Sequence, residues 1–205
     1  LAIYNLKGGV GKTAASINLA YASAKEGFKT LVWDLDPQGS SSFYLGAKAT
    51  VKNESRKLLN SEMDLKDAIQ STAYENLDVI PADISARHAD ILLNEMKQSK
   101  RKLVSLLSTL KNDYDIVLLD SPPGISVLHD AIFVAADWIL MPNIPTTLSI
   151  RSFESVLNYF KENDLDSSKL KCFFSMVDHR KNLHHEVINE FYKDKLFFKS
   201  YIPYL

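Results

Sequence analysis

The sequence predicts an α/β fold: a doubly wound, mostly parallel sheet with helices on both faces. The first observation is that apolar runs of five to seven residues alternate with helical stretches along the chain. The second is that these runs are continuously apolar, as in strands that are buried on both faces. Turns rich in glycine, proline and aspartate follow several of the runs. In such sheets the ligand sits at the carboxyl ends of the strands, so these turns form the candidate site.

Each element follows from a local pattern. Strands are expected where short apolar runs stand between turn signals, at residues 1–5, 30–34, 77–81, 116–120, 138–142, 171–177 and 200–202. Helices are expected where apolar residues recur with the helical period, at residues 13–26, 65–71, 85–110, 127–135, 147–163 and 185–196. Residues 40–60 have no clear period, and we expect an irregular, mobile segment there.

Length and composition bound the domain organisation. The chain has 205 residues, which suits a single domain over residues 1–205. It begins without a methionine, inside the first strand, and stops directly after the last one, so we expect both ends to be trimmed relative to the gene product. Hydrophobic content of 46% and charged content of 24% are typical of an ordinary globular protein.

Charge and cysteine content exclude several classes of protein. A formal net charge of −1 gives no overall attraction to DNA or anionic lipid, so a nucleic-acid surface has to be a local patch. No apolar stretch approaches the roughly 20 residues of a membrane span and no signal peptide opens the chain, so we expect a cytoplasmic protein without a transmembrane segment. The single cysteine, Cys172, lies in an expected strand and is interpreted as a buried thiol.

Residues 7–13, Lys-Gly-Gly-Val-Gly-Lys-Thr, connect the first strand to the first helix and are predicted to bind phosphate. Backbone N–H groups of such a loop turn around an anion, and the partly positive N-terminus of the next helix points to the same place. Lys12 reaches the β- and γ-phosphates in this arrangement, and Thr13 offers its hydroxyl to magnesium. The residues expected to contact the nucleotide here are Gly8, Gly9, Val10, Gly11, Lys12, Thr13 and Ala14.

A second lysine makes this loop unusual. The ordinary pattern asks for a glycine five residues before Gly11, where this chain has Leu6 followed by Lys7. Two ammonium groups about 8 Å apart repel by roughly 2 kcal/mol at an effective dielectric constant near 20. We therefore expect Lys7 and Lys12 to act together around a polyanion.

Two further strands are expected to end in carboxylates. Asp34 and Asp36 stand at i and i+2 before a Pro-Gln-Gly turn, which places both on the same side of the chain at a ligand-facing strand end. Asp120 ends another apolar run and precedes a Ser-Pro-Pro-Gly turn. Magnesium keeps several waters, so we expect Asp120 to act chiefly through one of them, beside Thr13. The alternative for these aspartates is that they only cap their turns.

No other chemistry competes with phosphate binding. The sequence has no Ser-His or Cys-His arrangement, and we interpret the histidines as surface or packing residues: His88, His129, His179, His184 and His185. Phosphoryl transfer needs positioning and charge neutralisation more than covalent chemistry, and the three motifs supply both.

The KGGxGK[ST] pattern of residues 7–13 resembles the deviant Walker A loop of the ParA/MinD family of P-loop ATPases, and residues 34–39 resemble the DxDPQG segment of its ParA (Soj-like) partition members. The strand that ends at Asp120 has the form of a Walker B strand. The resemblance implies ATP and Mg²⁺ as cofactors, with Lys7 crossing a dimer interface to the partner's nucleotide. It implies that Asp36 orients or activates the attacking water. The expected catalytic residues are Lys7, Lys12 and Asp36, and the expected metal residues are Thr13, Asp34 and Asp120, partly through water.

The resemblance extends almost to the end of the chain. Residues 175–183 resemble the family's MxDxRxNL segment and residues 201–203 its closing VIP strand. In the family these segments frame the adenine, so adenine contacts are implied for Asp178 and Pro203. Two departures leave the subfamily open: Ala14 stands where a second threonine is usual, and residues 145–149 differ from the usual Gln-Pro-aromatic stretch.

The implied function is that of a ParA-like ATPase that binds and slowly hydrolyses ATP, forms a homodimer with ATP and binds nonspecific DNA to drive plasmid or chromosome partitioning. A ParB-like activating partner and association with the nucleoid follow from the same resemblance. One candidate DNA surface is the set Lys97, Lys100, Arg101 and Lys102, which is also typical of a solvated helix face. The other, interleaved with acids, is Arg180, Lys181, Lys193, Lys195 and Lys199.

Three other functions stay open. A MinD-like ATPase positions a cargo on a membrane or another scaffold and needs a C-terminal amphipathic helix. An ATP-dependent metabolic enzyme of the same superfamily needs a substrate pocket and turns over steadily without a protein activator. A reductase of the nitrogenase iron-protein type needs cluster cysteines, and Cys172 stands alone.

Overall fold

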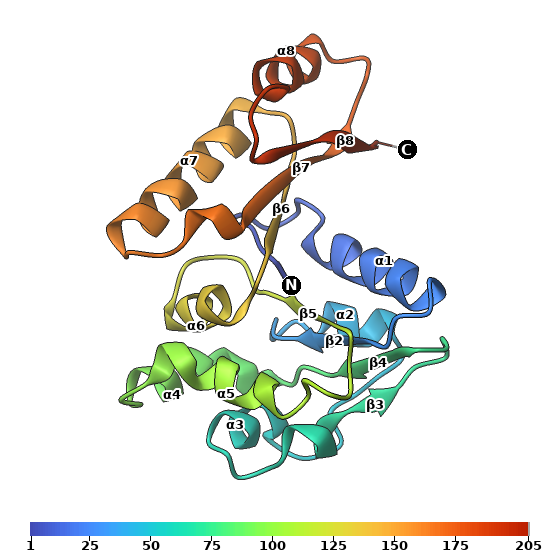
Figure 1. The fold of residues 1–205 in the computed structure, drawn as a ribbon, viewed down its shortest axis with the longest axis vertical. Helices are drawn as coiled ribbons and strands as arrows, with labels where there is room; N and C mark the ends of the chain where they lie inside the picture. Colours follow the sequence, from blue (N-terminus) through green and yellow to red (C-terminus); the bar gives the residue numbers. More distant parts are fainter. Residues whose placement is uncertain (205) are drawn as a thin grey trace.

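The computed structural model describes residues 1–204, and these form one sheet with helices against both faces (Figure 1). The strands are β1 (Ala2–Ile3), β2 (Thr30–Asp34), β3 (Gln70–Ser71), β4 (Leu77–Ile80), β5 (Ile116–Asp120), β6 (Ile139–Asn143), β7 (Leu170–Val177) and β8 (Phe197–Pro203). Their order is β3-β4-β2-β5-β1-β6-β7-β8, and every neighbouring pair is parallel except β3 with β4. The predicted α/β, mostly parallel sheet is confirmed.

Helices connect the strands and cover both faces of the sheet. They are α1 (Lys12–Lys25), α2 (Ser40–Tyr44), α3 (Glu54–Leu59), α4 (Ala89–Asn94), α5 (Lys102–Ser108), α6 (Val127–Ala135), α7 (Thr147–Glu162) and α8 (Asn182–Phe191), with 3-10 turns η1 (Leu65–Ala68), η2 (Ile84–His88), η3 (Ser99–Arg101) and η4 (Ser167–Lys169). Successive residues of β5 belong to different layers: Leu118 is in the same buried cluster as Ala20 of α1, and Leu119 is in the larger cluster that includes Ile132 of α6. This explains why the strands are continuously apolar.

The prediction of one long helix at residues 85–110 is wrong. The chain forms η2, α4, η3 and α5 there, and Gln98 leaves the helical conformation with φ −128° and ψ 43°. Leu93 and Leu103 both have 0% exposure. With the break, α4 and α5 pack separately against α6, and each places one of these leucines in the larger core.

The prediction of a helix at residues 65–71 is also wrong. One 3-10 turn, η1, forms there, with Leu65 and Ala68 buried. The chain then extends, and Gln70 pairs with Val79 of β4. The resulting strand, β3, is the antiparallel edge of the sheet.

Two other segments differ from the prediction. Residues 40–60, expected to be irregular, contain α2 and α3. Helix α8 spans Asn182–Phe191 rather than 185–196, because a turn at Asp194 leads the chain into β8.

The lone cysteine is confirmed as a buried strand residue. Cys172 lies in β7, and burial raises the pKa of its thiol. Of the histidines, His129 and His184 are buried and the other three are exposed. Within residues 1–204, no group of three or more His, Cys, Asp or Glu side chains is arranged to hold a metal ion. The helices of the same residues are all too short or too polar to cross a bilayer.

We expect Leu119→Ala to lower the free energy of unfolding by about 2–5 kcal/mol, because it leaves a cavity in a central strand. Leu119 is 1% exposed, whereas the control Ile91→Ala changes a residue on α4 that is 59% exposed. The control should stay within about 0.5 kcal/mol of the wild type. Denaturant unfolding followed by circular dichroism measures both, and equal losses would contradict a core between β5 and α6.

Candidate active site

The carboxyl ends of β1, β2 and β5 meet at one place, although these strands lie far apart in the sequence. Asp34 of β2 is directly opposite Asp120 of β5, and Ile3 of β1 is opposite Asp120 on its other side. The chain leaves β1 through the predicted phosphate loop and enters α1 (Figure 1). The three sequence motifs therefore converge on one edge of the sheet, beside the N-terminus of α1.

The phosphate loop has a backbone shape that its glycines permit. Gly9 and Gly11 have φ of 74° and 93°, in the left-handed region that strains other residues. Gly11 is the N-cap of α1, a helix of 14 residues with no acidic residue in its first turn. The unpaired N–H groups at this helix end, and its partial positive charge, are suited to an anion.

The two lysines of the loop are placed differently. Lys12 is 8% exposed, and its Nζ donates to the carbonyl oxygen of Lys7 at 2.9 Å, so its ammonium lies within the curve of the loop. Burial lowers the pKa of Lys12, while the charges of Asp120 and Asp36 raise it. Lys7 Nζ lies at the surface and donates to the carbonyl oxygen of Leu148, at the start of α7, at 2.6 Å.

Two residues that were not predicted from the sequence hold the loop in place. Asn5 donates from Nδ2 to the carbonyl oxygen of Pro142 at 2.9 Å and accepts from the Lys7 N–H at 2.9 Å. The Ser175 hydroxyl of β7 donates to the carbonyl oxygen of Val10 at 2.8 Å. Their only signal in the sequence is a polar residue that ends or interrupts an apolar run.

Serines from two helices surround the buried aspartates, and these were also not predicted. Asp120 Oδ1 accepts from the Ser16 hydroxyl of α1 at 2.9 Å, and its Oδ2 accepts from the Ser41 hydroxyl of α2 at 2.6 Å. Asp34 Oδ2 accepts from the N–H and the hydroxyl of Ser42 at 2.8 and 2.7 Å. Helix α2 is thus tied to both carboxylates.

The two carboxylates carry negative charge that the protein only partly balances. Asp34 and Asp120 are each 1% exposed. Burial raises the pKa of Asp34 to about 6, and the charge of Asp120 adds to the shift. Burial also raises the pKa of Asp120, and the hydroxyl groups of Ser41, Ser16 and Thr13 oppose this shift. Lys12 is the cation whose charge interacts with Asp120.

These residues fit a magnesium ion. Two carboxylates and the Thr13 hydroxyl offer oxygen ligands, and magnesium is usually bound by one or two carboxylates together with waters and phosphate oxygens. A divalent cation also neutralises the buried charge of Asp34 and Asp120, which explains why two carboxylates can be retained there.

Asp36 lies outside this buried pair, on the turn from β2 to α2. It is half-buried, its N–H donates to Asp34 Oδ1 at 3.2 Å, and its own Oδ1 accepts from the Gln38 N–H at 2.9 Å. The turn-capping contacts considered above are therefore present. They hold the Asp36 carboxylate next to the phosphate edge, where its charge still affects Lys12.

The turn after β5 is bonded to the phosphate loop. The N–H of Gly124 donates to the carbonyl oxygen of Leu6 at 3.1 Å, and its carbonyl oxygen accepts from the Tyr4 hydroxyl at 2.9 Å. His129 Nε2 contacts the carbonyl oxygen of Pro122 at 3.0 Å, so His129 is a packing residue that also holds this turn. The loop and the turn form one connected unit.

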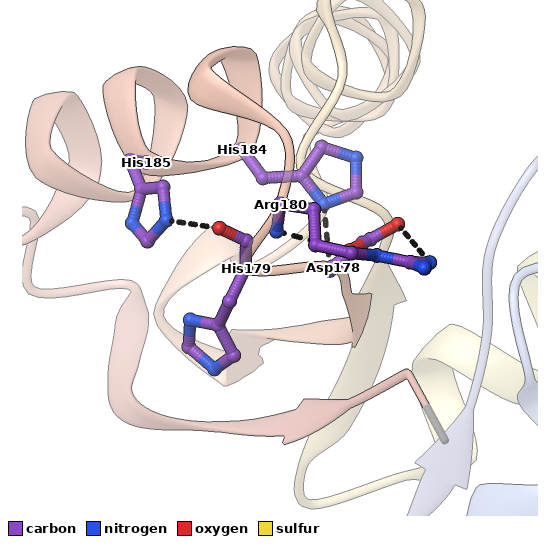
Figure 2. Close-up of polar contacts among 5 residues, drawn as sticks. All are labelled: Asp178, His179, Arg180, His184 and His185. Atoms are coloured by element: carbon purple, nitrogen blue, oxygen red, sulfur yellow. Dashed lines mark hydrogen bonds and ion pairs between the residues drawn. The ribbon is translucent and has the colours of Figure 1, made fainter.

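A cavity of about 380 Å³ lies at the ends of β6 and β7, across the phosphate loop from Asp120. It is lined by Ile144, Met176, Asp178, Arg180, Lys181, His184 and Tyr204. Arg180 donates from Nε and Nη2 to the two Asp178 oxygens at 2.9 and 3.0 Å and holds the pKa of that carboxyl well below its usual range (Figure 2). Pro203 does not line the cavity, although Tyr204 does. A similar cavity between η1 and α5 contains none of the motif residues.

Known proteins are similar to this chain in sequence. A family model described as an AAA domain matches residues 1–171. The sporulation initiation inhibitor protein Soj of Bacillus subtilis is 34% identical over 99% of this chain and 83% of its own length. The chain belongs to the ParA/MinD family of P-loop ATPases. Another relative of this ParA-type ATPase, the chromosome-partitioning ATPase Soj of Treponema pallidum, is 31% identical over 96% of this chain and 80% of its own.

Solved structures share the fold of this ParA-type ATPase. Cobyrinic acid a,c-diamide synthase from Mycobacterium smegmatis, solved with ADP and magnesium, is 26% identical with a TM-score of 0.88, over 100% of this chain and 86% of that one. The ATP complex of Cyanothece McdA is 22% identical with a TM-score of 0.85, over 97% of this chain and 82% of that one.

We expect Asp120→Asn to keep or raise the melting temperature of the ligand-free protein, because it removes a buried charge while the Ser16 and Ser41 hydroxyls can still pair with an amide. A gain of 1 kcal/mol would appear as about 2–4 °C. The same variant should lose the further stabilisation by ATP with Mg²⁺.

Differential scanning fluorimetry with and without ATP and Mg²⁺ measures both effects of Asp120→Asn. Asp67→Asn, at an exposed position on η1, is the control and should leave both unchanged. A variant at Asp120 that responds to ATP and Mg²⁺ like the wild type would contradict the proposed fit of the metal.

Proposed function

We propose that this ATPase forms an ATP-bound homodimer that binds nonspecific DNA and partitions a plasmid or chromosome. The proposal rests on the different positions of the two lysine side chains of the phosphate loop. Lys12 Nζ lies within the phosphate loop, whereas Lys7 Nζ lies at the surface against Leu148. One lysine within the loop suffices for a nucleotide bound there, so an outward lysine on the same loop suits the phosphates of a second subunit.

Each group near the loop has a distinct role in this proposal. Lys12 and the loop N–H groups orient and neutralise the phosphates. Thr13, Asp34 and Asp120 hold magnesium, partly through water, and the bound ion supplies further charge neutralisation. Asp36 accepts a hydrogen bond from the attacking water and orients it. Positioning and electrostatics carry phosphoryl transfer, so no protein nucleophile is required.

The adenine is proposed to occupy the cavity at the ends of β6 and β7. The contact from Ser175 to Val10 joins the phosphate loop to β7, so a nucleotide bound by its phosphates has this cavity within reach of its base. Asp178 lines the cavity, and Pro203 precedes Tyr204 at its rim. A volume of about 380 Å³ accommodates a purine.

Exposed apolar side chains near the site support a surface that a second copy covers. Phe43 of α2 is 80% exposed, Leu148 of α7 is 67% exposed, and Ile125, in the turn after β5, is 37% exposed. Exposed apolar groups next to a functional site are typical of an interaction surface. Lys7 Nζ donates to the carbonyl oxygen of Leu148, and in this proposal the phosphate loop couples ATP binding to dimerisation.

The basic residues Lys97, Lys100, Arg101 and Lys102 are a weaker candidate DNA surface in the structure than their spacing in the sequence suggests. Residues 97–101 fall in the break between α4 and α5, and Lys102 begins α5, so the set does not lie on one helix face. Lys100 pairs with Asp130 at 3.3 Å, and Lys102 donates to the Ser61 hydroxyl, so two of its cations are engaged within the protein.

The proposal assigns the DNA surface to α8 and β8. Four lysines are exposed on or beside these elements: Lys181, Lys193, Lys195 and Lys199. Arg180 of the same set is engaged by Asp178. Each contact with a DNA phosphate releases counterions, and dimerisation doubles the number of such contacts. A monomer with low affinity for DNA therefore binds DNA much more tightly as an ATP-bound dimer. The protein is then cytoplasmic, on the nucleoid when ATP-bound, until a ParB-like partner stimulates hydrolysis.

A second candidate function is ATP-dependent metabolic synthesis, which the likeness to cobyrinic acid a,c-diamide synthase favours. The higher identity of the two Soj relatives, 34% and 31%, favours partitioning. A synthetase turns over without a protein activator or a scaffold. A MinD-like ATPase forms the ATP-dependent dimer but binds a membrane instead of DNA.

Binding to a random DNA duplex tests the proposed function. We expect salt-sensitive binding by a dimer with ATP, and little with ADP or no nucleotide, measured by fluorescence anisotropy and light scattering. Reversing the charge of Lys193, Lys195 and Lys199 together should weaken binding, while reversing Lys97 and Arg101 should not. An ATP-dependent dimer that ignores DNA but binds liposomes supports the MinD-like alternative, and steady hydrolysis by a monomer supports the synthetase.

We expect Lys7→Ala to keep nucleotide binding within a few-fold and to lose ATP-dependent dimerisation. The Lys7 carbonyl oxygen that accepts from Lys12 is part of the backbone and survives the substitution. Light scattering with ATP and Mg²⁺ measures the mass, and Lys25→Ala at the end of α1 is the control. Normal dimerisation of the Lys7 variant would rule out the lysine bridge.

We expect Asp36→Ala to bind ATP and to remain a dimer with little hydrolysis, because the water loses its orienting carboxylate. Removal of one positioned group usually costs about 10²–10⁴-fold in rate. Single-turnover hydrolysis and light scattering measure the two properties. An unchanged rate of hydrolysis would show that Asp36 does not orient the attacking water.

A further inference from the structure

His184 is a buried, hydrogen-bonded residue in the lining of the cavity at the ends of β6 and β7. It is 3% exposed, stands in the first turn of α8, and lines the cavity together with Asp178 and Lys181. Its Nδ1 accepts a hydrogen bond from the Asp178 N–H at 3.0 Å (Figure 2). The imidazole is therefore fixed in place by the backbone of the segment that also lines the cavity.

The contact with Asp178 fixes the tautomer of the ring. A backbone N–H can only donate, so Nδ1 is the unprotonated nitrogen and the ring proton resides on Nε2. Figure 2 shows the second ring nitrogen on the edge turned away from Asp178. In the described residues, the contact at Nδ1 is the one hydrogen bond of the His184 ring. His184 thus presents a single N–H donor of fixed position.

The other polar groups nearby are already engaged or exposed. Both carboxylate oxygens of Asp178 accept from Arg180. His185, the next residue, is exposed and its Nε2 contacts the carbonyl oxygen of His179 at 3.0 Å. Of His179, His184 and His185, His184 is the one that is buried and lines the cavity.

We propose that His184 is a specificity-determining residue of the base subsite, whose Nε2–H donates a hydrogen bond to a ring nitrogen of adenine. This inference rests on the proposed function, because it needs a nucleotide held by the phosphate loop. A donor of fixed tautomer favours a base that presents an unprotonated ring nitrogen at that point, and disfavours one that presents an N–H.

Protonation of His184 removes this recognition. A second ring proton, on Nδ1, would face the Asp178 N–H, so two donors would oppose each other. The charged and titratable groups around the ring are Asp178, Arg180, Lys181, His185 and Tyr204. Burial, and then the charge of Lys181, lower the pKa of His184. Because the neutral ring is the binding form, the contact is intact at neutral pH and is lost as the pH falls through this lowered pKa.

Calorimetry with ADP and its 1-deaza, 3-deaza and 7-deaza analogues tests the proposal without hydrolysis. Each analogue lacks one ring-nitrogen acceptor. We expect one of them to bind the wild type about 2- to 12-fold more weakly than ADP, the effect of one neutral hydrogen bond. His184→Asn should bind that analogue and ADP equally, because asparagine can still accept from the Asp178 N–H but is too short to reach the position of Nε2.

Matched variants separate recognition from folding. His185→Asn, on the exposed side of the same helix, should keep the discrimination of the wild type. His184→Gln, whose side-chain amide can reach the position of Nε2, should restore part of it. Lowering the pH from about 7.5 to about 5.5 should weaken ADP binding more in the wild type than in His184→Asn.

Two negative results have different meanings. If the wild type binds ADP and all three analogues equally, or if His184→Asn keeps the discrimination, the role of His184 is overturned. If the wild type binds neither ADP nor ATP, the proposed function fails, and this inference fails with it.

Discussion

Two buried carboxylates at the carboxyl edge of the sheet set the arrangement of the whole site. Asp34 and Asp120 are opposite each other on β2 and β5, and burial raises the pKa of both. Removing such charges from water is unfavourable, and the hydroxyl donors with the Lys12 ammonium offset only part of that cost. The site is therefore suited to a divalent cation with phosphate, and the phosphate loop lies where this cation would meet a nucleotide.

Hydrogen bonds to these carboxylates, and one between backbone groups beside them, connect segments that lie far apart in the sequence. Ser41 and Ser42 tie α2 to both aspartates, and Gly124 ties the turn after β5 to the phosphate loop. A change in the phosphates or the metal at this edge is thus shared by α2, the turn and the loop. These segments also carry Phe43 and Lys7, so a nucleotide bound in the interior has a physical route to the proposed dimer surface.

The two ends of the proposed nucleotide site rely on different physics. At the phosphate end, charge and backbone N–H groups act on any triphosphate, and they supply the chemistry. At the base end, the cavity offers His184 as one donor of fixed tautomer, with Asp178 engaged by Arg180. Recognition by a single neutral hydrogen bond adds modest affinity, and the preference that it gives among bases is of the same modest size.

The sequence by itself determined the features that depend on neighbouring residues. The glycines of the phosphate loop, the i, i+2 spacing of Asp34 and Asp36 and the continuously apolar strands all act locally, so the sheet and the phosphate edge could be predicted from them. Only the tertiary structure decided that the helix expected at residues 85–110 is broken: Leu93 of α4 and Leu103 of α5 are both fully buried in the larger core. It also decided that Asp120 receives hydroxyl groups from residues 104 and 79 positions away. Such partners have no local signal, because only the packing of the whole sheet brings them within hydrogen-bonding distance.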